Sequence, residues 1–511
     1  MRRTILSAAV VCLVVSLLLS LNPPGRAQAQ KARADANLLL SVPHSEFFWW
    51  SPDGKTLAVA VMNTETETGG LLLYDAVSAK PRAEIKNEAP SSSAGVYFTP
   101  DGRTLIAHEG RVALYDAGDS RRLREFGQGT EPINLYRKIF VPVEEETRDY
   151  TGQTTTTLKQ PSNEDELKEL PTRYLSGRVV SPNGKSLLVR GREGAAQVYD
   201  LTTGRLQFTL ERAPDAPPKK KERGSGEALG EFSPDGKLIL TTHRNRKPRL
   251  WNAETGALVA DLGPQSDRVI GARFSSDGKF VATSTFGDGV VKIWEAATGK
   301  LKHTIGSDKD RNYFAAWNPA NNTFVTKTLK WEVNIWDAET GALVARLDNK
   351  AAKEKFDHNL TFVYSPDGKI LVTEGRGLAN FWSVVTLRKK VPIIAYLWDA
   401  ATGKFIAPLR DTKKRRMVIK NEYEFFWSPA GDHLVTSGVA VQVWSRGGEL
   451  LQGFDINAEG RASLSPDGKL LAFLSSDYGL GAAMADVAKL FIGKLPKLPT
   501  TQTHVWQIAK N

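Results

Sequence analysis

The chain has 511 residues and a net charge of +11, and its single cysteine, Cys12, lies in the first apolar segment. Because no other thiol is present, disulfides, thiolate metal ligands and a cysteine nucleophile are excluded from the rest of the chain. The basic excess forms no continuous stripe of Lys and Arg, so we expect no nucleic acid as partner.

The first 29 residues have the order of a secretory signal peptide. Arg2 and Arg3 precede an uncharged apolar run over 5–21, and a small-residue Ala-x-Ala site follows at 27–29. This order predicts a signal peptide over 1–29 and a secreted or periplasmic protein of the cell envelope. The run is also long enough to span a membrane, so retention as an anchor is the alternative. After cleavage we expect no transmembrane span.

A tetrapeptide Ser-Pro-Asp-Gly, or a close variant, recurs nine times, and each copy is followed by an apolar run that ends in Trp-Asp or a variant. Such repetition indicates one supersecondary unit used many times, so residues 30–511 are predicted to form one repeat array. The tetrapeptides begin at Ser51, Thr99, Ser181, Ser233, Ser275, Asn318, Ser365, Ser428 and Ser465. The second motif begins at Tyr74, Tyr115, Tyr199, Trp251, Trp294, Trp336, Trp398, Trp444 and Trp506.

The fifth repeat shows how one unit is expected to fold. Segment 275–278 suits a type I turn, because Asp277 can hydrogen-bond local backbone and Gly278 accepts the left-handed conformation. Gly299 has the same role in the second hairpin of the unit. Tight turns join consecutive antiparallel strands, so each unit is predicted to be a four-stranded antiparallel sheet. The large apolar residue before each tetrapeptide, such as Phe274, is expected to pack between neighbouring sheets.

The repeats resemble those of the WD-repeat β-propeller family, over about residues 37–507. Segments 336–341 and 398–403, both Trp-Asp-Ala-x-Thr-Gly, are among the closest matches. The Ser-Pro-Asp-Gly hairpins also resemble those of exported bacterial propellers of the surface-layer and Tol-system type. The resemblance implies an all-β fold: a single closed β-propeller of four-stranded antiparallel blades. Nine repeats predict nine blades, with eight as the alternative.

Two departures from the family pattern bear on its hydrogen bonds. The Gly-His pair that often precedes the first strand is missing, and Tyr replaces Trp in the first three units. The His-Asp-Ser-Trp network of regular WD repeats is therefore left open.

The ninth unit ends in its third strand, at Trp506. The apolar segment 36–42 is expected to supply the fourth strand, closing the ring and removing an exposed edge.

Extra sequence lengthens connections that should emerge on one face of the propeller, where binding is usually built. Segment 127–177 is expected to hold a hairpin of strands 135–143 and 154–158. Segment 476–503 is expected to hold an amphipathic helix over 482–494. The insertions are 127–177, 212–228, 378–393, 408–420 and 476–503.

Two basic clusters in these insertions are the candidate partner-binding residues. The expected partner is a protein or an anionic envelope polymer, bound by a monomer. The candidates are Lys219, Lys220, Lys221, Arg223, Lys413, Lys414, Arg415 and Arg416.

The sequence contains no recognised catalytic, nucleotide-binding or metal-binding motif, and its seven histidines are scattered singly. We therefore expect no catalytic residues, metal or cofactor, and predict an exported, non-catalytic interaction scaffold. The alternative is an envelope enzyme of the lyase or hydrolase type with its site in the central channel. Carboxylates and histidines converging on the channel would favour the enzyme.

Overall fold

The structure is a computed structural model. It describes residues 38–63, 68–86, 95–108, 112–126, 131–132, 143–148, 154–159, 179–190, 196–210, 229–242, 248–263, 265, 269–285, 289–307, 311–328, 330, 332–348, 361–374, 393–410, 424–438, 440–454, 458–476 and 501–508.

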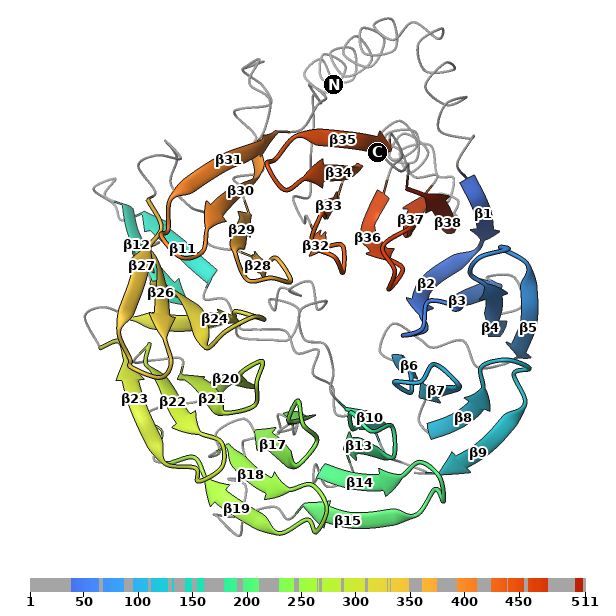
Figure 1. Ribbon diagram of the computed structural model, residues 1–511, viewed down its shortest axis with the longest axis horizontal. Helices are drawn as coiled ribbons and strands as arrows, with labels where there is room; N and C mark the ends of the chain where they lie inside the picture. The colour runs from blue at the N-terminus through green and yellow to red at the C-terminus, as the bar shows by residue number, and fades with distance from the viewer. Residues whose placement is uncertain are drawn as a thin grey trace, which may run out of the picture.

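Nine four-stranded antiparallel sheets stand as blades around a central channel (Figure 1). The prediction of a nine-bladed, all-β propeller is confirmed. The strands of a blade are called a to d from the channel outward. Blade one has β2 (Ser45–Trp50), β3 (Thr56–Asn63), β4 (Thr68–Asp75) and β5 (Pro81–Lys86). Blade two has β6 (Gly95–Phe98), β7 (Thr104–His108), β8 (Val112–Asp116) and β9 (Arg122–Phe126). Blade three has β10 (Glu131–Pro132), β13 (Ser186–Arg190), β14 (Ala196–Asp200) and β15 (Leu206–Leu210).

The next three blades follow the same order. Blade four has β16 (Leu229–Phe232), β17 (Leu238–Thr242), β18 (Arg249–Asn252) and β19 (Leu258–Asp261). Blade five has β20 (Val269–Phe274), β21 (Phe280–Thr285), β22 (Val291–Glu295) and β23 (Leu301–Ile305). Blade six has β24 (Asn312–Trp317), β25 (Thr323–Thr328), β26 (Val333–Asp337) and β27 (Leu343–Arg346).

The last three blades complete the ring. Blade seven has β28 (Phe362–Tyr364), β29 (Ile370–Glu374), β30 (Ile393–Asp399) and β31 (Phe405–Arg410). Blade eight has β32 (Glu424–Trp427), β33 (His433–Ser437), β34 (Val441–Ser445) and β35 (Leu450–Phe454). Blade nine has β36 (Ala458–Leu464), β37 (Leu470–Ser476), β38 (Thr501–Gln507) and, outermost, β1 (Leu38–Pro43).

The N-terminal strand closes the ring, as predicted. β1 pairs antiparallel with β38, with Leu40 opposite Val505. Blade nine is also tied to blade one, because the buried Thr503 hydroxyl donates to Ser45 Oγ at 2.6 Å. The first and last described strands therefore lie in one blade.

Turn chemistry fixes the hairpin between strands a and b. Ser275 Oγ donates to Asp277 Oδ1 at 2.7 Å and accepts from the Phe280 N–H at 3.0 Å. The Gly278 N–H donates to the Ser275 carbonyl at 3.0 Å, and Gly278 has a φ of 76°. These bonds confirm the tight hairpin predicted from the tetrapeptide. The same pattern recurs in the turns that begin at Ser51, Ser233, Ser365 and Ser465.

The hydrophobic core lies between blades rather than within one. Leu240 of blade four packs with Phe274 and Trp294 of blade five. Val42 of blade nine packs with Leu57 of blade one. Each blade buries its faces against two neighbours, and a separate hydrophobic cluster lies at each contact between blades. The predicted packing role of the aromatic before each turn is confirmed at Phe274.

Five tryptophans of the third strands make the same kind of hydrogen bond. Each donates its indole N–H to a threonine of the second strand in its own blade. The pairs are Trp251–Thr241, Trp294–Thr283, Trp336–Thr326, Trp398–Thr373 and Trp444–Thr436. In blade one a tyrosine, Tyr74, replaces the tryptophan, and Val59 occupies the register of the threonine. Because five repeats have both the tryptophan and the threonine, this hydrogen bond could have been predicted from the sequence.

The insertion at 127–177 differs from its predicted place. It was expected in the connection between blades two and three, but Glu131 and Pro132 form the first half of strand a in blade three. Val180 continues that strand opposite Leu187. The inner strand is therefore built from two separate segments.

The hairpin predicted within the insertion is also shifted. Residues 135–143 were expected as its first strand, whereas β11 (Val143–Arg148) pairs with β12 (Thr154–Lys159). Residues 135–142 lie outside the described residues. The second strand is confirmed, and its partner is 143–148 rather than 135–143.

Candidate interaction surfaces

The connections between strands b and c and between strand d and the next blade leave the ring at one face, because consecutive strands are antiparallel. We call this the loop face. Four of the predicted insertions fall between such strands: after β15, after β29, after β31 and after β37. The insertions thus share one face of a rigid scaffold.

The candidate basic residues lie in these connections but outside the described residues, as does the helix predicted over 482–494. They are Lys219, Lys220, Lys221, Arg223, Lys413, Lys414, Arg415 and Arg416. The strand ends that hold the second cluster are described. Ile393 and Arg410 are cross-strand partners in blade seven, so the connection entering β30 and the one leaving β31 start side by side.

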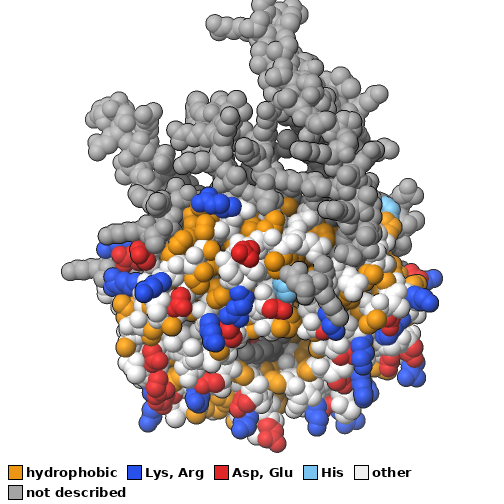
Figure 2. Space-filling model, turned by 45° about the horizontal axis from the view of Figure 1, so that its top comes forward, with side chains coloured by type: hydrophobic (Ala, Val, Ile, Leu, Met, Phe, Trp, Pro, Cys, Tyr) orange, Lys and Arg blue, Asp and Glu red, His pale blue; other side chains and the backbone are white. Residues whose placement is uncertain are grey.

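The opposite face, formed by the a–b and c–d turns, has balanced charge. Lys279 Nζ lies 3.5 Å from Asp277 Oδ2, and Lys469 Nζ lies 3.0 Å from Asp467 Oδ2. In the view of Figure 2, Lys and Arg side chains are interspersed with Asp and Glu side chains over the described surface. Turn charges paired in this way give little net attraction for a charged partner.

The turn carboxylates are also occupied by their own turns. Hydrogen bonds from the Thr99 hydroxyl and the Arg103 backbone N–H lower the pKa of Asp101. The Thr203 backbone N–H and hydroxyl lower the pKa of Asp200 in the same way. These acids stay ionised near neutral pH and serve the turns rather than a ligand.

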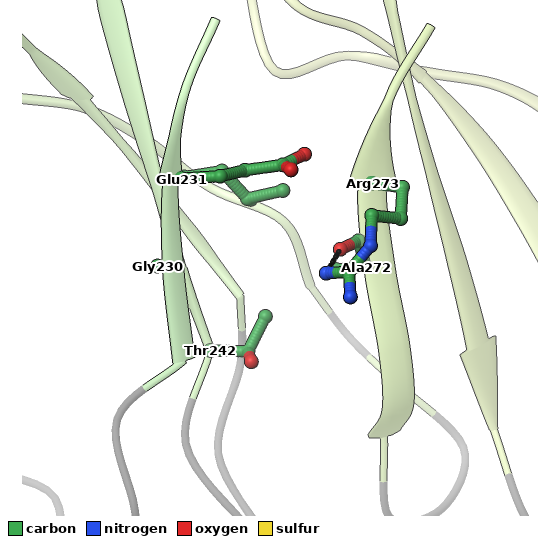
Figure 3. Close-up of a pocket in the computed structure, with 6 residues that line it drawn as sticks. Gly230, Glu231, Thr242, Ala272 and Arg273 are labelled. Atoms are coloured by element: carbon green, nitrogen blue, oxygen red, sulfur yellow. Dashed lines mark hydrogen bonds between the residues drawn. The ribbon is translucent and has the colours of Figure 1, made fainter. Parts of the chain in front are cut away.

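A small polar recess lies in the channel wall between the inner strands of blades four and five (Figure 3). Buried Glu231 reaches across from β16, and its Oε1 accepts the backbone N–H of Phe274 at 2.8 Å. Arg273 on β20 donates to the carbonyl of Ala272 at 3.0 Å. Thr242 completes the polar lining.

The recess is a contact between blades rather than a substrate site. It has no room for a water molecule, and Glu231 is held by the backbone of the next blade. Glu231 and Arg273 were not among the residues predicted from sequence. Their register was the signal that could have identified them: both directly precede the aromatic residue of strand a, where repeats seven and eight have the apolar residues Val363 and Phe426.

A half-buried lysine, Lys327, lies between blades six and seven. Burial lowers the pKa of Lys327 to about 8, and the negative charge of Glu374 opposes this shift. Glu374 Oε2 also accepts the Thr361 hydroxyl at 3.2 Å. Such a lysine is partly neutral in mildly alkaline solution, so this contact between blades varies in charge with pH.

The described part of the chain contains no group of three or more His, Cys, Asp or Glu residues able to hold a metal ion. Within the same residues no helix has the length and apolarity needed to cross a membrane. The apolar run at 5–21 lies outside them.

Comparison with known proteins identifies the repeat. The family model described as "WD domain, G-beta repeat" matches residues 256–295. The match covers strand d of blade four and strands a to c of blade five, so the sequence repeat is offset from the blade by one strand.

Similar proteins carry the same repeat. The angio-associated migratory cell protein of Homo sapiens is 26% identical over 39% of this chain and 45% of its own length. An uncharacterized WD repeat-containing protein of Synechocystis is 26% identical over 29% of this chain and 39% of its own length. Protein HIR1 of Candida albicans is 24% identical over 38% of this chain and 20% of its own length. The chain thus spans less than half of each of these relatives.

Among solved structures, the C-terminal WD40 domain of Sif2 aligns with a TM-score of 0.43 and 12% identity, over 78% of this chain and 94% of that one. The repeat match and the nine blades confirm the resemblance to WD-repeat β-propellers. Propellers of this class commonly act as protein-interaction scaffolds.

Proposed function

We propose that this protein is an exported, non-catalytic scaffold of the cell envelope that binds a protein or an anionic polymer through its loop face. The observation that carries the proposal is the gathering of inserted connections on that face. The opposite face consists of short turns with balanced charge. A rigid ring that gathers four of its five insertions on one face is suited to binding by loops.

The strand ends Ile393 and Arg410 of blade seven hold two basic segments, which favours an anionic partner. Arg388, Lys389 and Lys390 precede Ile393 by only a few residues, and Lys413 follows Arg410 closely. Since Ile393 and Arg410 are paired, two basic segments start from neighbouring points. Only a few residues join each basic cluster to its strand end, and a residue spans at most about 3.6 Å, so the distance between the two clusters is limited. Several cations held close together attract an anionic partner at a rate and affinity that fall with salt.

The polar recess at Glu231 does not support the enzyme alternative, because it has no space for a water molecule, let alone a substrate.

The test compares two variants that each lose four positive charges. In the first, Lys413, Lys414, Arg415 and Arg416 become Ser. In the control, four turn lysines of the opposite face become Ser: Lys237, Lys279, Lys369 and Lys469. Capture from an envelope extract and binding to soluble polyphosphate are measured at low and high salt. The proposal expects the first variant alone to lose binding. Equal loss in both variants, or in neither, would contradict it.

A further inference from the structure

The a–b turn of blade three has asparagine at a position where most of the other a–b turns have aspartate. Residues 181–184 read Ser-Pro-Asn-Gly and contain the only Asn-Gly pair in the sequence. Asn183 is exposed, and Gly184 has a φ of 71°, the left-handed conformation that Gly278 has in blade five. The aspartates at this position in other turns are Asp53, Asp101, Asp235, Asp277, Asp367 and Asp467.

Asn183 makes the side-chain hydrogen bonds that aspartate makes in the other turns. Its Oδ1 accepts the Ser181 hydroxyl at 2.7 Å and the Lys185 backbone N–H at 3.0 Å. In blade five Asp277 Oδ1 accepts the equivalent two bonds at 2.7 Å and 3.0 Å. Because the Nδ2 atom of Asn183 takes no part in either bond, aspartate at position 183 fits the same turn.

An asparagine followed by glycine can lose its side-chain amide without an enzyme. The Gly184 backbone nitrogen attacks Asn183 Cγ and forms a C–N bond, and the Cγ–Nδ2 bond breaks. The proton of the Gly184 N–H leaves with the amine as ammonia. Water then opens the cyclic imide at either of its carbonyls, which gives aspartate or isoaspartate. Glycine has no Cβ to obstruct the attacking nitrogen, and asparagine is a thermolabile residue.

We propose that Asn183 is a site of spontaneous deamidation, and that aspartate is the product that the folded turn retains. Aspartate keeps both Oδ1 bonds and puts a carboxylate next to Lys185, much as Asp277 Oδ2 lies 3.5 Å from the lysine of its own turn. Isoaspartate adds a methylene to the backbone, which displaces the Gly184 N–H from the Ser181 carbonyl that it meets at 2.8 Å. Deamidation to aspartate therefore gives blade three the same turn as six other blades.

The folded turn should slow this reaction without preventing it. The Gly184 N–H donates to the Ser181 carbonyl, and two donors hold Asn183 Oδ1, so both reacting groups are engaged. Surface turns nevertheless open locally at a much lower cost in free energy than global unfolding. Asn183 is also exposed to the water that the second step consumes. We therefore expect slow conversion in the folded protein and faster conversion in urea.

The experiment incubates the full chain at mildly alkaline pH, folded or in urea, and follows both samples by peptide mapping with mass spectrometry. Deamidation adds one dalton to the peptide that contains Asn183, and fragmentation distinguishes aspartate from isoaspartate. Asn321 is the internal control in the a–b turn of blade six. Its Oδ1 accepts the Thr323 N–H at 2.9 Å, but the residue after it is Asn322 rather than glycine. The variant Asn183→Asp measures the stability of the product.

We expect the folded protein to gain one dalton at Asn183 and none at Asn321 over the same period, with aspartate as the main product. The Asn183→Asp variant should melt at the same temperature as the intact protein or above it. No gain of mass at Asn183 in the folded protein by the time the chain in urea is converted would overturn the proposal. Isoaspartate as the main product, or a lower melting temperature of the variant, would also overturn it. The loop-face test changes other residues, so either proposal can fail without the other.

Discussion

In five blades the threonine of strand b is the hydrogen-bond acceptor of the tryptophan in strand c. The Trp294 residue is 2% exposed, and the only polar atom of its side chain, Nε1, donates to Oγ1 of Thr283, which is fully buried. A buried N–H without an acceptor costs the free energy of its lost hydration. In blades one to three a tyrosine takes the place of the tryptophan in strand c. An apolar residue such as Val59 takes the place of the threonine in strand b.

Thr283→Val should therefore destabilise the protein. Valine keeps the shape of the side chain but removes the acceptor of the Trp294 indole. We expect a loss of about 1–3 kcal/mol in the free energy of unfolding, measured by urea denaturation. Thr283→Ser, which keeps the hydroxyl, is the control and should cost less. A valine variant as stable as the serine variant would show that the bond contributes nothing.

Asp367 gives the stability a pH dependence of known sign. The Ser365 hydroxyl, followed by the Arg446 guanidinium, lowers the pKa of Asp367 from 3.8 to about 2. Arg446 lies in blade eight, 2.8 Å from this carboxylate of blade seven. Because the pKa is lower in the folded state, the stabilisation is present above pH 4 and is lost between about pH 4 and 2.

Asp367→Asn should thus lower the melting temperature at pH 7 and have little effect near pH 2. Both side chains are more than a third exposed, so the loss should stay below about 1 kcal/mol. Asp467→Asn is the matched control, since Asp467 pairs with Lys469 of its own turn. Melting curves from pH 2 to 7 provide the measurement. An effect of Asp367→Asn that is constant over this range would contradict the assignment.

At the scale of elements, the c–d turns of blades three to eight pack on the outer strand of the preceding blade. Gly403, in the turn of blade seven, has a φ of 68°, and a Cβ there would come within 2.2 Å of the Arg346 carbonyl oxygen in β27. The neighbouring Asp348 N–H donates to the Gly403 carbonyl at 3.1 Å. The turn therefore joins two blades as well as two strands.

Gly403→Ala should destabilise the protein by more than about 1 kcal/mol, because the left-handed backbone and the close carbonyl both disfavour a side chain. Gly453→Ala is the control: a Cβ at that glycine of β35 meets nothing within 4 Å. Thermal melts of both variants test this. If the two substitutions lower the melting temperature equally, the contact with β27 is not what requires glycine at position 403.

Most elements of this fold could be predicted from sequence, because each repeat carries its own turn residues. Serine, aspartate and glycine at fixed spacing identify the hairpin at 275–278 as clearly as the one at 465–468. The inner strand of blade three could not be predicted. Glu131 and Pro132 have neither a turn motif nor an apolar pattern, and only their pairing with Val189 and Arg190 identifies them as a strand.

At the scale of the whole molecule, the function was less predictable than the fold. The face that carries the insertions follows from strand order alone, and the sequence therefore indicated it. The pairing of Ile393 with Arg410, which brings two basic segments to one place, is set by the strand register of blade seven and has no motif. Contacts between blades, such as Glu231 with the Phe274 N–H, depend on ring geometry that no single repeat encodes.

Closure of the ring depends on a strand that comes from the other end of the chain. β1 covers the outer edge of β38, and Val42 within it is 2% exposed. Ser45 Oγ donates to the Val42 carbonyl at 3.0 Å and accepts from Thr503, so the strand is also tied to blade one. A chain that begins at residue 44 should leave the edge of β38 open and lose the burial of Val42.

That loss alone is worth about 1.5–3 kcal/mol, and the unpaired backbone adds to it. We therefore expect the melting temperature to fall by several degrees compared with a chain that begins at residue 38 and keeps β1. The open edge should also promote self-association, which light scattering detects, since an unpaired strand is a template for another. Equal melting temperatures and equal scattering of the two chains would mean that eight complete blades hold the ninth without its outer strand.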